Sequence, residues 1–308
     1  MDSSITETRH ENLLLVQTTD FFYPLVESPY EQGMIAAANV LSDMYACGVS
    51  ECDNMLMILG VSLGMSQEDQ DIVTKEMNKG FRDQAAIADT KVTGGQTVLN
   101  PWPIIGGVAT AIEHKDKVVD PQFAKAGDVI VLTKALGTQL AVNLKEWMRT
   151  DAAWTRRVPS DEIITREVAQ AAYDKARKSM SRLNRVGAGL MIKHGAHAAT
   201  DVTGFGILGH AQNLASHQAA ELDIILHKLP IIAGMLAVDA HMPNVFKLKE
   251  GYSAETSGGL MVALPADVAD AFIADIEAME GCPAWIIGKV VAGSKNARLA
   301  DDVEYLEV

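Results

Sequence analysis

The segment A-A-T-D-V-T-G-F-G-I-L-G, residues 198–209, decides how the second half of the chain is interpreted. A short apolar run ends at Asp201 and Thr203, three glycines follow within a few residues, and an apolar-periodic stretch begins. This pattern predicts a strand over 196–200, a tight turn, and a helix over 207–216. Backbone N–H groups at the start of a helix can bind an anion, and glycines allow close approach. An aspartate at the same turn can hold a divalent cation that bridges to the anion.

Two other interpretations of this turn stay open. Residues 204–209 match the dinucleotide-binding pattern G-x-G-x-x-G, but Asp201 and Thr203 stand where an apolar strand should run directly into the first glycine. The candidate ribose-binding acids, Glu221 and Asp223, precede the next apolar run instead of ending it. A glycine turn with no ligand is the second alternative. We favour a turn that binds phosphate and metal.

The totals of the sequence fit a two-domain protein. At 308 residues, 48% of them hydrophobic, the chain can form two cores of ordinary size. No apolar run reaches the roughly 18–20 residues of a membrane span, and the first fifteen residues are polar with mixed charge, unlike a signal peptide. Cys47, Cys52 and Cys282 have no zinc or disulfide spacing, so we expect reduced thiols and a cytoplasmic location.

The net charge of −14 restricts the partners of the chain. We therefore expect no nucleic-acid partner, because binding a phosphate backbone needs clustered lysine and arginine side chains. An acidic protein that binds phosphates would need metal ions to offset the repulsion. The overall charge therefore favours the same metal-assisted phosphate site as the turn around Asp201.

Asp43 is the second candidate metal ligand. Residues 31–47 have the apolar periodicity of a helix, in which Asn39 and Asp43 project from one face. Asp43 falls in the last turn, where the helix dipole disfavours negative charge by about 0.3–1 kcal/mol. It therefore needs a compensating cation. A salt bridge to lysine or arginine is one possibility, and a bound metal is our preference.

Two further segments carry residues suited to a binding site. Q-T-T-D, ending at Asp20, follows the apolar run 13–16 and forms the carboxyl end of a strand predicted over 13–20. This pattern is typical either of a site edge or of a solvated strand end. T-G-G-Q-T, residues 93–97, holds two glycines that allow close backbone approach to a ligand. A hairpin or a β-bulge would explain the same glycines without any ligand.

The order of the predicted elements favours an α+β architecture with mixed sheets. Residues 114–127 are polar and contain a proline, so the predicted boundary separates an N-terminal domain, 1–116, from a C-terminal domain, 117–308. The apolar strands expected at 13–20, 54–63 and 104–112 belong to the smaller domain, which is too small to cover every sheet face alone. We therefore expect a homodimer formed through the N-terminal half.

Several motifs together resemble the selenophosphate synthetase (selenide, water dikinase) family. They are Q-T-T-D at 17–20, N-V-L-S-D-M-Y-A at 39–46, T-G-G-Q-T at 93–97, A-T-D-V-T-G-F-G-I-L-G-H at 199–210 and E-T-S-G-G-L at 255–260. E-C-D-N-M-L-M at 51–57 and N-P-W at 100–102 are most similar to the eukaryotic branch. The resemblance covers essentially the whole chain, and the set is specific although no single motif is.

The resemblance implies a two-domain fold of the aminoimidazole-ribonucleotide-synthetase (PurM-like) type, whose N-terminal domain joins a second subunit's sheet in a dimer. It implies the synthesis of selenophosphate from selenide and ATP, with release of AMP and orthophosphate. Asp2, Asp43 and Asp201 would be magnesium ligands. ATP would be bound by Asp20, Asp43 and Asp201 together with the strand residues Gly94, Gly95, Gln96 and Thr97.

One departure bears on activity. In the family, a glycine-rich segment with a catalytic cysteine or selenocysteine and a lysine precedes the first metal aspartate, whereas here Asp2 follows Met1 directly. The resemblance thus places both catalytic residues upstream of Met1, and we expect the 308-residue chain to be catalytically impaired. A non-catalytic nucleotide-binding or regulatory paralogue is the main alternative. A superfamily member acting on a ribonucleotide is a third class.

Overall fold

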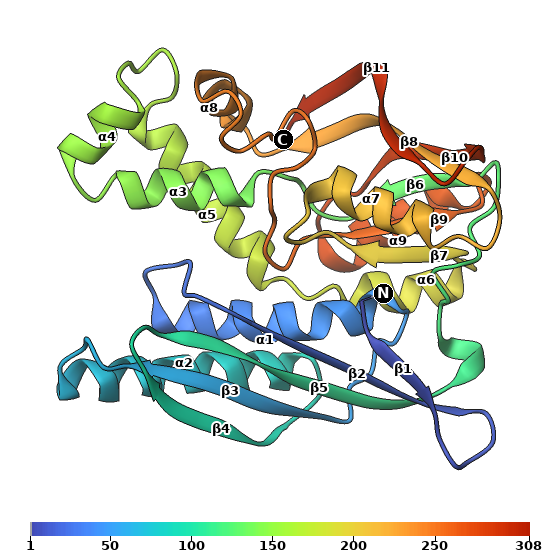
Figure 1. The fold of residues 1–308 in the computed structure, drawn as a ribbon, viewed down its shortest axis with the longest axis horizontal. Coiled ribbons are helices and arrows are strands. Elements are labelled where there is room, and N and C mark those ends of the chain that lie inside the picture. Colours follow the sequence, from blue (N-terminus) through green and yellow to red (C-terminus); the bar gives the residue numbers. More distant parts are fainter. Residues whose placement is uncertain (1) are drawn as a thin grey trace. The chain divides into compact units, whose positions relative to one another are not determined.

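The computed structural model describes residues 2–308 as an α+β protein with two mixed β-sheets, which confirms the expected fold class (Figure 1). The chain divides into two compact units. The N-terminal unit ends at Val119 and also includes Ser181–Lys193, whereas the C-terminal unit consists of Asp120–Met180 and His194–Val308.

The limits of these units differ in detail from the predicted domain boundary. The predicted boundary between residues 116 and 117 remains a prediction. The compact units differ from it in one respect, because Ser181–Lys193 belongs to the N-terminal unit. This segment contains helix α6, Arg185–Lys193, which packs against the first helix of the N-terminal unit. Asn184 just before it donates a 3.1 Å hydrogen bond to the Ser42 hydroxyl.

The N-terminal unit is built on a five-stranded sheet of order β1-β2-β5-β3-β4. Neighbouring strands are antiparallel except β3 and β4, which are parallel. The strands are β1 Ser4–Glu7, β2 Leu13–Phe22, β3 Asn54–Ser62, β4 Val92–Asn100 and β5 Ile104–His114. The sheet is therefore mixed, and the strand that carries T-G-G-Q-T is at its edge.

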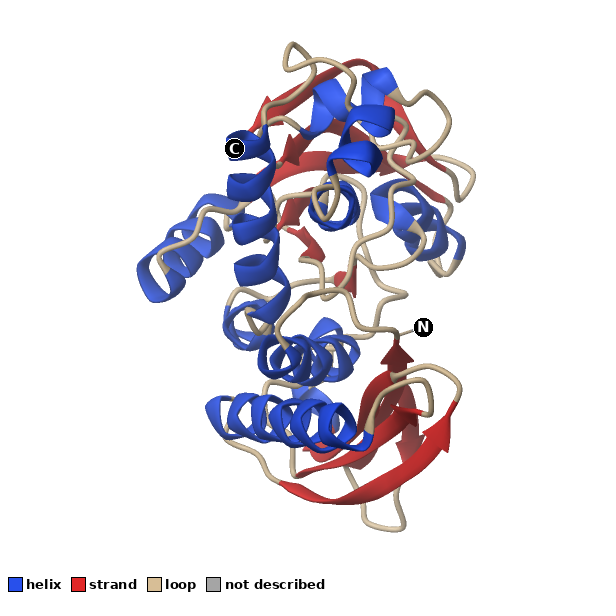
Figure 2. Cartoon of the chain, turned by 90° about the vertical axis from the view of Figure 1, so that its left-hand side faces the viewer, coloured by secondary structure: helices blue, strands red, loops and turns tan. Residues whose placement is uncertain are grey.

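Two long helices, α1 Pro29–Ala46 and α2 Gln67–Ile87, lie together on one side of this sheet (Figure 2). Helix α1 begins at Pro29 because proline suits the first helical position and the Ser28 hydroxyl accepts a hydrogen bond from the Glu31 N–H. Alternate strand residues such as Met55, Leu59 and Ile105 are fully or almost fully buried beneath the helices.

The other face of the N-terminal sheet carries exposed apolar side chains. Phe21, Leu56, Val98 and Ile112 retain 56%, 37%, 47% and 56% of their accessible surface. The strand registers place these positions on the face opposite Met55 and its buried neighbours. Four large apolar residues on one sheet face exceed what isolated surface hydrophobes explain.

The C-terminal unit contains a six-stranded sheet of order β11-β8-β10-β6-β9-β7. Only β11 and β8 pair in parallel, and the other neighbours are antiparallel. The strands are β6 Val129–Leu132, β7 Ala198–Asp201, β8 Leu222–Ile231, β9 Leu260–Leu264, β10 Trp285–Ala292 and β11 Ala297–Glu307.

Helices surround this second sheet, and one of them follows the glycine turn. The elements are α3 Thr138–Trp147, α4 Asp151–Arg157, α5 Arg166–Ser181, α7 Gly206–Ser216, α8 Met235–His241 and α9 Ala269–Glu280, and a single 3₁₀ turn, η1 Lys115–Lys117, lies in the N-terminal unit. Helix α7 packs against β7, β8 and β11. Throughout residues 2–308, no helix has both the length and the apolar character needed to cross a bilayer.

Helices α1 and α2 cross where a glycine in each meets the backbone of the other. A Cβ atom on Gly33 would lie 2.2 Å from the Met77 carbonyl oxygen, and one on Gly80 would lie 1.8 Å from the Tyr30 carbonyl oxygen. Backbone atoms cannot move aside as a flexible side chain can. The absence of side chains at both glycines therefore fixes how closely the two helices approach.

We predict opposite effects for two Gly→Ala substitutions within helices. Gly80→Ala should lower the free energy of unfolding by about 1–3 kcal/mol because the methyl group forces α1 and α2 apart. Gly189→Ala is the matched control on α6, where a Cβ would meet no atom within 4 Å. It should raise that free energy by about 0.5–1 kcal/mol through helix propensity alone. Urea unfolding measures both, and a Gly80→Ala protein as stable as the unaltered one would contradict the crossing argument.

Candidate active site

Asp43 lies in the last turn of α1, as predicted, and is held by a hydroxyl group. The Thr18 hydroxyl on β2 donates a 2.7 Å hydrogen bond to Asp43 Oδ2. Thr18 is 4% exposed, so this contact is at the buried junction of helix and sheet. The ion pairs recorded for residues 2–308 do not join Asp43 to lysine or arginine. The salt bridge considered from the sequence therefore has no support among the described residues.

Asp20 lies beside the same helix, near the carboxyl end of strand β2, as predicted. The strand continues two residues beyond the predicted end at Asp20, to Phe22, which pairs with Ile105. The Asn39 side-chain amide of α1 donates to Asp20 Oδ2, and the Phe21 N–H donates to Asp20 Oδ1 at 2.8 Å. Burial raises the pKa of Asp20 although both hydrogen bonds oppose the rise.

Asp2, Asp20 and Asp43 form a carboxylate cluster in the N-terminal unit, in which the charges of Asp2 and Asp20 both act on Asp43. One carboxylate oxygen of Asp2 and one of Asp43 lie within 4.8 Å of each other. Burial, together with the nearby charges of Asp2 and Asp20, raises the pKa of Asp43 to about 7. Like charges held this close are unfavourable in isolation. The arrangement fits a divalent cation, which prefers carboxylate oxygens and removes the repulsion.

Asp201 is at the end of β7 in the C-terminal unit and is 1% exposed. The turn after it has the predicted glycine geometry. Gly206 starts α7 with φ of +70°, and a Cβ there would lie 2.6 Å from the Gly251 carbonyl oxygen, so other residues are strained at this position. The prediction of a strand, a tight turn and a helix is confirmed, with the helix over Gly206–Ser216.

His210, on the first turns of α7, fixes the start of this turn. Its Nε2 accepts hydrogen bonds from the Thr203 N–H at 3.0 Å and lies 3.2 Å from the Thr203 hydroxyl. Burial lowers the pKa of His210 to about 4, so the ring is neutral near pH 7 and carries its proton on Nδ1. The histidine is a rigid support for the backbone that follows Asp201.

Gly94, Gly95, Gln96 and Thr97 all lie exposed on β4. The register between β3 and β4 shifts beside T-G-G-Q-T, so the segment contains a bulge in a strand and does not form a hairpin. Within the sheet, β5 and β3 separate β4 from the strand that carries Asp20. At about 4.8 Å per strand spacing, the structure of one chain does not bring these four residues beside Asp20 and Asp43.

Glu255 has a role that sequence reasoning did not identify. Its carboxylate accepts hydrogen bonds from the Gly137 N–H at 2.6 Å, the Thr138 N–H at 3.0 Å and the Thr138 hydroxyl. The side chain thereby caps the N-terminus of α3 across more than a hundred residues of sequence. Burial raises the pKa of Glu255 to about 7. Nearby, buried Lys134 donates through Nζ to the Ser257 carbonyl oxygen at 2.8 Å. The sequence shows the motif E-T-S-G-G, but it gives no sign that Glu255 bonds to Gly137 and Thr138, which are far away along the chain.

Comparison with protein-family models assigns both parts of the chain. Residues 2–112 match the N-terminal domain of AIR synthase related proteins, and residues 125–300 match the C-terminal domain. A solved structure of AaThiL complexed with AMPPCP and TMP superposes with a TM-score of 0.72 at 17% identity, covering 98% of this chain and 88% of that one. At this identity the likeness shows the fold, which confirms the expected two-domain PurM-like architecture.

Curated relatives are much closer in sequence. The chain is 52% identical over its whole length to selenide, water dikinase 2 from Homo sapiens, covering 68% of that protein. It is 50% identical to selenide, water dikinase from Dictyostelium discoideum, over 96% of this chain and 80% of that protein. These matches include the segments that hold the carboxylate cluster and the glycine turn. The chain therefore belongs to the selenide, water dikinase (selenophosphate synthetase) family, within the wider group of AIR synthase related proteins.

Proposed function

We propose that this protein is a phosphotransferase that uses ATP to convert selenide to selenophosphate, with AMP and orthophosphate as the other products. The observation that carries the proposal is the identity of about 50% to proteins named selenide, water dikinase over essentially the whole chain. The partly buried carboxylates of the N-terminal unit suit the cation that phosphate chemistry requires. The AMPPCP in the AaThiL complex supports a nucleotide triphosphate as the substrate of this fold.

We assign the metal role to Asp2, Asp43 and Asp201. Magnesium, when bound, would supply the counter-charge that lets an acidic protein approach a triphosphate. Thr18 and Asn39 would hold the Asp43 and Asp20 carboxylates in place through the hydrogen bonds described above. Phosphoryl transfer depends mostly on positioning and charge stabilisation, so the task of these residues is to orient the nucleotide.

We further propose that the protein works as a homodimer formed by the N-terminal unit. The exposed apolar face that contains Phe21, Leu56, Val98 and Ile112 supports an interface with a second copy. Strand β4 is an edge strand with exposed side chains on both faces.

The burial of the cysteines supports a second candidate function, in which the protein binds nucleotide without making selenophosphate. The family resemblance requires a thiolate or selenolate for selenide. Cys47 is 4% exposed and burial raises its pKa to about 12, and burial also raises the pKa of Cys52. Neither provides an accessible thiolate near pH 7. Cys282, on the loop after α9, is only partly exposed. The alternative is therefore a nucleotide-binding or regulatory paralogue that does not make selenophosphate.

The metal assignment predicts a shared loss in two variants. Asp43→Asn and Asp201→Asn should each weaken ATP binding in magnesium by at least about tenfold, or about 1.4 kcal/mol, while the fold is retained. Asp71→Asn on the exposed face of α2 removes the same charge and should change nothing. Isothermal calorimetry with and without EDTA measures the effect. Unchanged affinity in both variants and in EDTA would remove the metal from the proposal.

The interface assignment predicts the mass of the particle in solution. Light scattering at micromolar concentration should give twice the chain mass for the unaltered protein. Ile112→Lys should shift that mass toward the monomer because it places a charge in the apolar face. Ile72→Lys, on helix α2 and 53% exposed, is the matched control and should remain dimeric. A monomeric unaltered protein, or a dimeric Ile112→Lys protein, would show that another surface or none is used.

The reaction itself distinguishes the two candidate functions. Incubated with ATP, magnesium and selenide, the proposed synthetase should give a selenophosphate signal by phosphorus NMR, whereas a nucleotide-binding paralogue should bind ATP and give none. A full-rate signal would place the selenide-handling group within these residues. The same measurement on a Cys47→Ser, Cys52→Ser and Cys282→Ser protein would then show whether a thiol of this chain is involved.

A further inference from the structure

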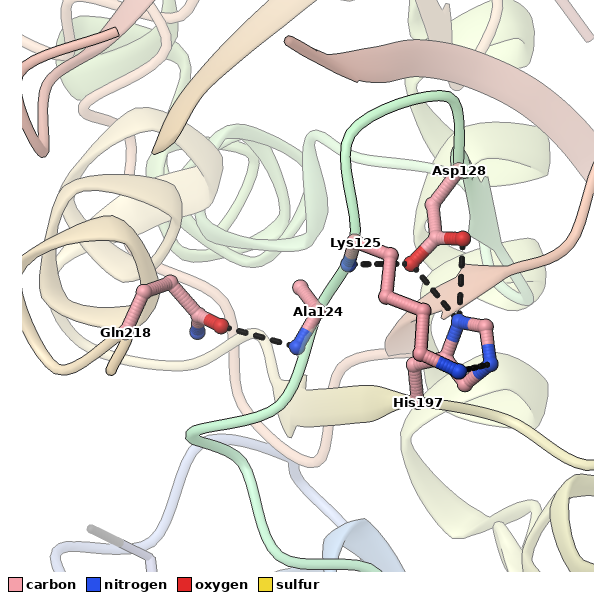
Figure 3. A network of polar contacts seen from close by, with 5 residues as sticks. All are labelled: Ala124, Lys125, Asp128, His197 and Gln218. Atoms are coloured by element: carbon pink, nitrogen blue, oxygen red, sulfur yellow. Dashed lines mark hydrogen bonds and ion pairs between the residues drawn. The ribbon is translucent and has the colours of Figure 1, made fainter. Parts of the chain in front are cut away.

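A polar network on the C-terminal unit has the form of an activated nucleophile. Figure 3 shows Asp128, His197 and Lys125 in one line, with the histidine ring between the carboxylate and the ammonium group. His197 Nδ1 lies 2.9 and 3.0 Å from the two Asp128 oxygens, and its Nε2 lies 2.8 Å from Lys125 Nζ. None of these three residues is part of the carboxylate cluster or the glycine turn.

The partners on its two sides fix the tautomer of His197. A carboxylate only accepts hydrogen bonds, so Nδ1 carries the proton that is donated to Asp128. A lysine ammonium only donates, so Nε2 has no proton and accepts from Lys125 Nζ. The imidazole is therefore neutral, and its free electron pair points at a Lys125 N–H. A base oriented by a buried carboxylate and bonded to a nucleophile is the arrangement found in nucleophilic catalysis.

Asp128 is rigidly placed to orient the ring. It is 3% exposed, immediately precedes β6, and also accepts a 2.8 Å hydrogen bond from the Lys125 N–H. Its own N–H donates to the Lys125 carbonyl oxygen at 3.0 Å, and its carbonyl accepts from the Val290 N–H at 2.8 Å. His197 is tied to the same sheet because its N–H donates to the Ala263 carbonyl oxygen at 2.9 Å.

The backbone that carries Lys125 is held equally firmly. Gln218 Oε1 accepts from the Ala124 N–H at 2.9 Å, and Gln218 Nε2 donates to the carbonyl oxygens of Pro121 and Leu214 (Figure 3). Gly127, with φ of +99°, donates to the Val290 carbonyl oxygen. The loop is thus fixed on both sides of Lys125, whereas the Lys125 side chain itself is exposed to reagents in solution.

We propose that Lys125 is a site of covalent acylation, with His197 as the base and Asp128 as the residue that positions it. The co-reactant is an activated acyl compound, either a thioester or an acyl phosphate. An Nζ proton passes to His197 Nε2, the amine attacks the acyl carbonyl carbon, and a C–N bond forms. The C–S or C–O bond breaks, and the thiolate or phosphate leaves. The nitrogen loses a second proton as the amide forms, so two protons leave Nζ in all: one is taken up by the leaving group and the other passes from His197 to solvent. No atom is oxidised or reduced.

Acylation would change this surface in a defined way. Lys125 would lose its positive charge and its ability to donate three hydrogen bonds, so His197 Nε2 would lose the ammonium that it now faces. The Asp128–His197 contact would remain. The modified protein would thus be more acidic at this edge of the C-terminal sheet, with little change in its fold.

The experiment compares two lysines within one molecule. The unaltered protein is incubated in separate arms with acetyl-coenzyme A and with acetyl phosphate, and acetylation of Lys125 and of exposed Lys75 on α2 is followed by peptide mass spectrometry. Lys125 should react at least about tenfold faster than Lys75 in one or both arms, and the faster arm identifies the donor class. Equal rates at the two lysines in both arms would overturn the proposal without need of any variant.

Variants then test the role of His197. His197→Gln keeps an acceptor for the ammonium but no base, so the Lys125 rate should fall to that of Lys75. Adding imidazole to His197→Ala protein should restore part of the Lys125 rate, which a merely structural role would not do. Lys75 serves as the control for folding and reagent quality. An unchanged Lys125 rate in His197→Gln, or an acyl group on His197 alone, would also overturn the proposal.

Discussion

The N-terminal unit holds two partly buried carboxylates against a helix, and the ion pairs of its described residues join neither of them to a lysine or arginine. Asp20 and Asp43 lie between β2 and α1, where Asn39 and Thr18 supply neutral hydrogen bonds. A lysine or arginine here would have made a more stable apo-protein, but it would have competed with any cation for the same oxygens. Neutral donors fix the carboxylates and leave their charge available. The packing of α1 on the sheet therefore places Asp20 and Asp43 where neutral side chains are their hydrogen-bond donors.

The C-terminal unit also holds a carboxylate away from solvent, but there the start of a helix supplies its hydrogen-bond donors. Glu255 is also buried, yet its carboxylate is fully engaged by the N-terminus of α3 through Gly137 and Thr138. Its charge is used inside the fold to complete a helix, whereas Asp43 faces another carboxylate. Glu255 and Asp43 thus share a raised pKa but differ in their partners: the hydrogen bonds to Glu255 identify a helix cap, and the pKa alone would not separate it from the candidate cation ligand that we propose at Asp43.

Local rules predicted those parts of the fold and site whose determinants are close in sequence. The sequence alone predicted that Asp43 lies in the last turn of a helix and that a tight glycine turn follows Asp201. Both could be predicted because helix ends and positive φ angles are local properties. Strand β2 extends two residues past its predicted end at Asp20 because pairing with β5 carries it to Phe22. The roles of Glu255 and His197 could not be predicted, since each depends on partners that only the tertiary fold brings near.

The return of Ser181–Lys193 to the N-terminal unit has a consequence for how the chain is made. During synthesis, the ribosome must translate about sixty residues of the other unit before α6 can emerge and pack against α1. Until then the surface that receives α6, around Ser42, stays open to solvent. Because the chain is synthesised from its N-terminus, the first unit can be completed only after synthesis of the second unit has begun. A gene fragment that stops at Val119 would encode an N-terminal unit without helix α6.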